Sequence, residues 1–311
     1  MEYSIVKCPK CEKELPVPED LKNCICMYCG EHFRIEKQQE KPEQEVNTSE
    51  LEEAYQQKLA QVGRLLEEYQ KLLLLFTAEA YGKAFLEYVK LGEELLIPAD
   101  RYAMGSEEQK SQVTEEISAK LMLAVGKNVG GKKGILSANT SAKILDQYRF
   151  FLAVYLIPML SYLKLSISEA LAARIMEDWK MSYPKYEFRK ASFDELEDGF
   201  RRKGFCFITT AVCDTLNKPD DCDELMLFRK FRDQYLRSSE NGSELIEEYY
   251  RIAPKIVAYL NMQTNSEEKY RKLWKKDLVR CLNYIEKDRN EQCKKAYIRM
   301  VRRLEKQLPF E

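Results

Sequence analysis

The chain has 311 residues, of which 45% are hydrophobic and 32% are charged, as in an ordinary globular protein. Its net charge of −1 excludes a global electrostatic attraction to nucleic acid or to an anionic membrane surface. Because it holds only 12 Gly and 10 Pro, we expect a mostly α-helical, multi-helix body with a small β zinc ribbon at the N-terminus.

Three features bear on the compartment of the protein. No apolar signal core follows Met1, so we expect no export. The longest apolar run, residues 150–163, is interrupted by Pro158 and is shorter than the roughly 20 residues that cross a bilayer, so we expect a buried helix and no membrane contact. Ten cysteines without an export signal indicate a reducing compartment, which predicts a cytoplasmic protein.

Residues 1–36 predict a zinc ribbon. Two residues separate Cys8 from Cys11, and two separate Cys26 from Cys29, after which Gly30 permits a tight turn. Each pair offers two thiolates from one turn, and four thiolates complete the tetrahedral coordination of Zn²⁺. Since four cysteines leave no open coordination position, we expect the zinc to be structural and not catalytic.

Other residues of this module have a predicted role outside the site. Cys24 either lies outside it or exchanges with Cys26 as a ligand, and we favour the first because Gly30 completes the Cys26 turn. His32, the only histidine, is expected at the surface, and short strands are expected at residues 15–18, 24–26 and 32–35. Seven acidic and five basic residues disfavour phosphate binding and favour a protein partner.

Residues 37–49 are polar and contain Pro42, and they predict a flexible linker. Beyond it we expect a helical domain over residues 50–200 and a second over residues 201–311, which could also pack together as one body. A helix is expected to stop at Pro98. Capping boxes predict helix starts at Ser49, Ser106, Ser166, Ser192 and Asp288.

Residues 126–133 approximate a phosphate-binding loop. The pattern requires a hydroxyl where Lys133 stands, and it requires a strand before the loop where the sequence predicts a helix. We therefore expect a flexible Gly/Lys loop and no nucleotide site there.

The apolar stretch at residues 204–213 begins a region that resembles a known family. Cys206-Phe207-Ile208, the run from Arg229 to Asp233, Tyr249-Tyr250 and Pro254 occur in this order in the bacterial CFI-box C-terminal domain. The resemblance covers about residues 204–290 and departs from the family where Cys213-Asp214 replaces Tyr-Gly. It implies a fold and little mechanism, because the family has no established activity.

The residues of this region can also be interpreted individually. Cys206 and Cys213 are seven positions apart and share one face of a helix. Asp220 or Asp221 is expected to cap a helix over residues 222–236, on which Arg229 and Asp233 have the spacing of an ion pair.

Two interpretations of this helix remain open. The first is a helix packed through Leu225, Phe228 and Phe231 with a charged flank. The second is a partly buried Arg/Asp cluster, with Arg232 reaching a carbonyl, Glu247 or Glu248, that fixes the Cys206 segment or binds an anion.

Cys206 is the best candidate for a reactive cysteine. A catalytic thiol must ionise near pH 7, usually beside a histidine, a helix N-terminus or cations. Arg201, Arg202 and Lys203 precede Cys206 closely, whereas acidic residues surround Cys222. The alternatives are that Cys206, Cys213 and Cys222 are small core residues or ligands of a second metal, although no Cys-x-x-Cys pair supports the latter.

Residues 265–311 carry fourteen basic and eight acidic residues, the only region where nucleic acid binding is electrostatically reasonable. Its aromatic residues fall on the apolar stripe of the helices, as do Cys281 and Cys293, so we expect core positions and a solvated basic face.

The sequence thus predicts a non-enzymatic zinc protein that acts as a protein-interaction or regulatory module. A thiol-dependent enzyme or redox switch centred on Cys206 is the alternative, and nucleic acid binding through the basic C-terminal helices is a weaker one.

Overall fold

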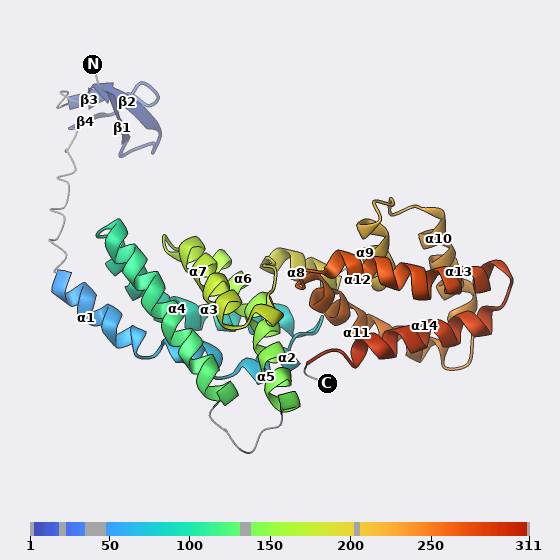
Figure 1. Cartoon of the computed structure of the whole chain (residues 1–311). Helices are drawn as coiled ribbons and strands as arrows, with labels where there is room; N and C mark the ends of the chain where they lie inside the picture. The colour runs from blue at the N-terminus through green and yellow to red at the C-terminus, as the bar shows by residue number, and fades with distance from the viewer. Residues whose placement is uncertain (1–2, 19–22, 35–47, 131–137, 202–205, 310–311) are drawn as a thin grey trace. The chain divides into compact units, whose positions relative to one another are not determined.

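The computed structural model describes residues 3–18, 23–34, 48–130, 138–201 and 206–309, and divides the chain into two compact units (Figure 1). Met1–Glu50 forms the first unit and Leu51–Glu311 the second. The fold is mostly α with two small antiparallel sheets near the N-terminus, which confirms the predicted fold class. Residues 37–47 of the predicted linker lie outside the described residues.

The N-terminal unit consists of two hairpins. Strand β1 (Tyr3–Lys7) pairs with β2 (Glu14–Pro18), and β3 (Asn23–Ile25) pairs with β4 (His32–Arg34). The three predicted strands are therefore present, and β1 is added to them. Leu15, Val17, Cys8 and Cys26 form a small core of their own. So few buried residues cannot stabilise a fold of about 35 residues by themselves, so we expect the stability of this unit to depend on its cysteines.

The body begins with a series of helices that continues to residue 201. They are α1 (Thr48–Leu59), the 3₁₀ turn η1 (Val62–Leu66), α2 (Tyr69–Leu74), α3 (Tyr81–Ala103), α4 (Glu107–Gly130), α5 (Ala138–Phe151), the π-helical segment η2 (Leu152–Leu156), α6 (Ile157–Leu163), α7 (Ser168–Ser182), the 3₁₀ turn η3 (Pro184–Tyr186) and α8 (Phe193–Arg201). Helix α4 packs against both α3 and α7.

The remaining elements form the C-terminal half of the body. They are α9 (Phe207–Thr215), α10 (Asp223–Lys230), the π-helical segment η4 (Phe231–Leu236), α11 (Gly242–Asn261), α12 (Ser266–Leu273), the π-helical segment η5 (Trp274–Leu278), α13 (Val279–Glu286) and α14 (Asn290–Glu305). Helix α14 packs against α11 and α13, and α9 packs against α11 and α12.

The described residues between 51 and 309 share one hydrophobic core. Phe150 on α5 meets Tyr259 on α11 edge to face, with ring centroids 5.8 Å apart. The backbone N–H of Arg189 donates to the carbonyl of Met262 at 2.6 Å, and the Gln147 amide donates to the carbonyl of Pro309 at 2.9 Å. The two predicted helical segments thus meet through apolar and polar contacts within one compact unit.

Two local predictions are wrong. Helix α3 continues through Pro98 to Ala103, because Leu95, Leu96 and Ala99 are buried and their packing outweighs the lost backbone hydrogen bond. The expected loop at residues 126–133 is helical as far as Gly130, and the rest lies outside the described residues.

The capping boxes had mixed outcomes. The hydroxyls of Ser106 and Ser192 accept from the backbone N–H three residues on, as predicted. Ser166 instead donates to the buried carboxylate of Asp100 at 2.6 Å, and α7 begins at Ser168. Asp288 adopts a positive φ of 53°, and α14 begins two residues later. Contacts with distant elements decide these two cases.

The apolar run at residues 150–163 forms the end of α5, η2 and α6. Its residues from Phe150 to Leu160 are buried, which confirms the predicted buried helix. Among the described residues, no helix has the length and apolar character needed to cross a membrane.

Candidate functional site

The four cysteines predicted to bind metal lie together. Their Sγ atoms are all within 4.8 Å of one another, and the distances from Cys8 to Cys29 and from Cys11 to Cys26 are both 3.6 Å. Four thiolates around a tetrahedral metal ion at about 2.3 Å have sulfurs about 3.8 Å apart. The donor set and its spacing therefore fit a tetrahedral metal site.

Two turns of the same geometry present these sulfurs. In the first turn, the backbone N–H of Cys8 donates to the backbone carbonyl of Lys13, and the carbonyl of Cys8 accepts from the backbone N–H of Glu12. In the second turn, the backbone N–H of Cys26 donates to the backbone carbonyl of Glu31, and the carbonyl of Cys26 accepts from the backbone N–H of Gly30.

Glu12 and Gly30 both have positive φ, 57° and 71°, as these turns require. The sequence predicted the role of Gly30 and missed that of Glu12, where a side chain occupies the same left-handed conformation.

Backbone donors polarise the sulfurs. Burial opposes ionisation of Cys26, but N–H groups of Tyr28 and Cys29 outweigh it and lower the pKa of that thiol to about 6. The N–H of Glu31 also favours the Cys29 thiolate, yet burial and the neighbouring sulfurs raise the pKa of Cys29 to about 12. Such a cluster ionises fully only beside a cation.

Cys24 and His32 are not part of this cluster. The thiol of Cys24 donates to the carbonyl of Ile25 at 3.6 Å. His32 lies on β4 with its side chain exposed, as predicted.

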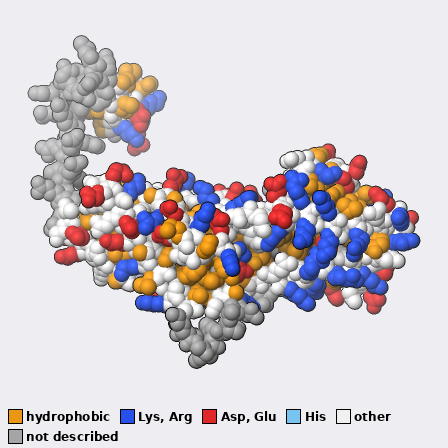
Figure 2. Space-filling model, in the orientation of Figure 1, with side chains coloured by type: hydrophobic (Ala, Val, Ile, Leu, Met, Phe, Trp, Pro, Cys, Tyr) orange, Lys and Arg blue, Asp and Glu red, His pale blue; other side chains and the backbone are white. Residues whose placement is uncertain are grey.

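Large apolar side chains are exposed on this unit (Figure 2). Met27 and Tyr28, between the two cysteines of the second turn, are 71% and 56% exposed. Ile5 on β1 and Ile25 on β3 are 70% and 58% exposed. These four side chains come from both hairpins of the unit.

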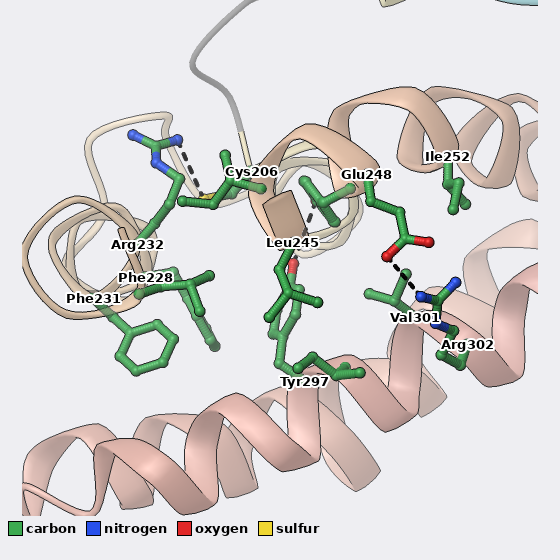
Figure 3. Close-up of a pocket in the computed structure, with 14 residues that line it drawn as sticks. Cys206, Phe228, Phe231, Arg232, Leu245, Glu248, Ile252, Tyr297, Val301 and Arg302 are labelled. Atoms are coloured by element: carbon green, nitrogen blue, oxygen red, sulfur yellow. Dashed lines mark hydrogen bonds and ion pairs between the residues drawn. The ribbon is translucent and has the colours of Figure 1, made fainter. Parts of the chain in front are cut away.

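Cys206 lies at one end of an apolar cavity of about 80 Å³ (Figure 3). Its side chain is 6% exposed, and Nη1 of Arg232 lies 3.9 Å from its sulfur. The Glu248–Arg302 ion pair, at 2.6 Å, borders the other end. The apolar wall comes from α10, η4, α11 and α14 and includes Phe228, Phe231, Leu245, Ile252, Tyr297 and Val301.

The environment of Cys206 keeps its thiol neutral. Burial raises its pKa to about 11, although Arg232 and Arg229 act in the opposite direction. At pH 7 this sulfur is therefore a poor nucleophile.

The charged residues of this region pair differently from the prediction. Arg229 donates to Asp220 at 2.7 Å, whereas Asp233 binds Arg232 through two hydrogen bonds of 2.8 Å. The structure thus brings Cys206, Arg232 and Asp233 together, and Arg229 ties the turn before α10 to that helix.

The helix start at α10 also differs. Its N-cap is Cys222 and not Asp220 or Asp221, and the carboxylate of Asp220 accepts a hydrogen bond from Arg229 instead. The sulfur of Cys222 lies 3.8 Å from that of Cys213, and burial together with this neighbour raises the pKa of Cys213 to about 12. In the described part of the chain, these cysteines form no metal-binding group of three or more donors.

A tyrosine network holds the start of α9, and the sequence pointed to only part of it. The hydroxyl of Tyr249 accepts from the N–H of Ile208 at 3.0 Å, and Tyr297 lies 3.2 Å from the Thr209 hydroxyl and 3.4 Å from Tyr249. Tyr249 belongs to the motifs quoted above. The only sequence signal for Tyr297 is its helical spacing from Cys293.

Basic side chains gather over the C-terminal helices in Figure 2. Several are paired: Arg302 with Glu248, Arg303 with Asp277 and Arg271 with Glu267. The aromatic residues of this region pack against the core, as predicted, and both Cys281 and Cys293 are fully buried.

Comparison of the chain with family models, with curated proteins and with solved structures finds no match.

Proposed function

We propose that this chain is a non-enzymatic zinc protein that binds another protein through its N-terminal unit. The observation that carries the first part is the cluster of Cys8, Cys11, Cys26 and Cys29. Four thiolates in a tetrahedron select Zn²⁺ among the common divalent ions, and they leave no coordination position for a substrate. Zn²⁺ would supply the positive charge that the crowded sulfurs need, and it would join the two hairpins.

The exposed apolar residues support the second part. Met27 and Tyr28 lie in a turn that the metal would hold rigid, so their side chains would be presented to a partner with little loss of conformational entropy. Two of the basic residues of this unit are paired with acidic ones, Lys10 with Glu31 at 2.8 Å and Lys7 with Glu14 at 3.8 Å. A surface of this kind favours an apolar partner surface on another protein over a polyanion.

We further propose that residues 204–290 form a CFI-box C-terminal domain. The support is the order of the motifs and the fact that they meet in space. Cys206 contacts Arg232, and Tyr249 binds the backbone of Ile208. The neutral thiol of Cys206 supports a structural role for this segment over catalysis. Free cysteines throughout the described chain support a reducing compartment such as the cytoplasm.

Partner binding is tested with a double variant, Met27→Ser with Tyr28→Ser. Leu123→Ser is the matched control, since Leu123 is 58% exposed on α4. We expect at least one partner protein to co-purify with the intact chain and with the control variant, but not with the double variant. The same partner, once purified, should bind the purified chain directly. Equal recovery of every co-purifying protein by the double variant and the control would refute this function, provided that the metal content of both is unchanged.

A further inference from the structure

A polar cleft of about 700 Å³ lies within the body, between elements that are distant in the sequence. Helix α5, turn η3, the segment between α11 and α12, and the end of the chain after α14 all contribute to its wall. Five basic residues line it: Lys143, Arg149, Lys185, Lys269 and Lys306. Among the described lining residues only Asp146 and Glu187 are acidic, so this described part of the wall has an excess of positive charge.

Arg149 is the most deeply placed of these residues. It is 9% exposed, and its guanidinium lies 5.7 Å from the ring centroids of both Tyr186 and Tyr259. It forms an ion pair with Asp146 and donates to the Tyr259 hydroxyl at 3.3 Å. Its Nε is buried and has no hydrogen-bond partner among the described residues. Buried guanidinium N–H groups are nearly always satisfied, so this donor, like the buried Oδ1 of Asp146 that also lacks a hydrogen-bond partner, marks a polar site that the described residues alone do not complete.

Lys269 brings a second cation close to the first. Burial lowers the pKa of Lys269, and the positive charge of Arg149 lowers it further. The ammonium donates to the neutral amide oxygen of Gln263, and the carboxylates of Asp146 and Glu268 only partly offset the effect of burial and of Arg149 on its pKa. An anion bound between the two residues would relieve their repulsion and satisfy Nε of Arg149.

We propose that this cleft binds a small organic phosphate of about nucleotide size. Its volume falls in the range of roughly 300–1,000 Å³ typical of small-molecule sites. A ligand with several negative charges matches the cations spread over its wall better than a monocarboxylate does, and guanidinium favours phosphate through paired N–H donors. The site shares no residue with the sulfur cluster, and its test is therefore independent of zinc.

The test is calorimetric titration of the intact chain with inorganic pyrophosphate, ADP and citrate at constant ionic strength. We expect binding of pyrophosphate and ADP with dissociation constants below about 1 mM, and weaker binding of citrate. Lys185→Gln with Lys269→Met should weaken binding about tenfold or more, while Lys295→Gln, an equally basic residue on α14, should change it less than about twofold.

Three results would overturn the proposal. They are no binding of either phosphate ligand at about 1 mM, equal loss in the Lys295 control, and citrate binding as tight as ADP. Tighter binding of a single-stranded oligonucleotide, lost in the double variant, would assign the cleft to nucleic acid instead. Arg149→Gln, checked for folding by circular dichroism, should also abolish binding. An unchanged affinity in this folded variant would contradict the role given to Arg149.

Discussion

Glu12 and Gly30 occupy the same position in the two cysteine turns, each directly after the second cysteine and each with positive φ. An added Cβ at Gly30 meets no atom within 4 Å, so a side chain there has only a conformational cost. We predict that Gly30→Ala costs about 1–2 kcal/mol and weakens zinc binding about tenfold. Glu12→Gly should strengthen it or leave it unchanged, because relief of the left-handed strain of Glu12 is offset in part or in full by the greater entropy that glycine loses on folding.

Chelator competition measures both affinities. Glu12→Gln controls for the lost charge, and Gly63→Ala, in the other unit, controls for a general effect of the substitution. An unaltered affinity in Gly30→Ala would mean that the turn does not need its left-handed conformation to hold the metal.

The thiol of Cys206 should react slowly at neutral pH. With burial raising its pKa to about 11, we expect its alkylation by iodoacetamide to lag behind that of the partly exposed Cys222, and to accelerate as the pH rises toward 11. Site-resolved mass spectrometry of the native chain gives these rates, and the denatured chain gives the reference. Rapid labelling of Cys206 at pH 7 would restore the thiol-enzyme alternative.

The hydroxyl of Tyr249 should contribute measurably to stability. Tyr249→Phe leaves the N–H of Ile208 without its acceptor, which costs about 1–3 kcal/mol in a buried setting. Tyr235→Phe is the control, because its hydroxyl binds Glu291 at the surface and should contribute less than about 0.5 kcal/mol. Urea unfolding compares them, and equal losses would contradict the role of the tyrosine network.

Protonation of Asp233 should make the body less stable at acidic pH. Hydrogen bonds from Arg232 lower the pKa of Asp233, so the carboxylate stabilises the fold above its unfolded pKa of about 3.9. This contribution is lost as the pH falls through the lower pKa of the folded state. Asp233→Asn should reduce stability at pH 7 and show a smaller further loss on acidification. Unfolding at a series of pH values tests this, with Glu53→Gln on α1 as the control.

The sequence was most informative where a structure depends on neighbours in the chain. The spacing of Cys8, Cys11, Cys26 and Cys29 specifies two turns, and a capping box such as that of Ser192 needs only four residues. Such local geometry is set by the chain itself.

The sequence-based predictions failed where contacts with residues distant in the sequence determine the local structure. The Ser166 hydroxyl binds Asp100, which lies 66 positions earlier, and Pro98 is held in a helix by the surrounding core. The polar cleft was missed for the same reason. Arg149 and Lys269 are 120 positions apart, and no local pattern shows that both line this cleft.

The metal content of the purified chain tests the central claim most directly. Inductively coupled plasma mass spectrometry should find one zinc ion per chain, retained in Cys24→Ser and lost in Cys8→Ser with Cys29→Ser. A folded chain that contains no zinc, or that keeps its zinc after loss of these two cysteines, would contradict the account.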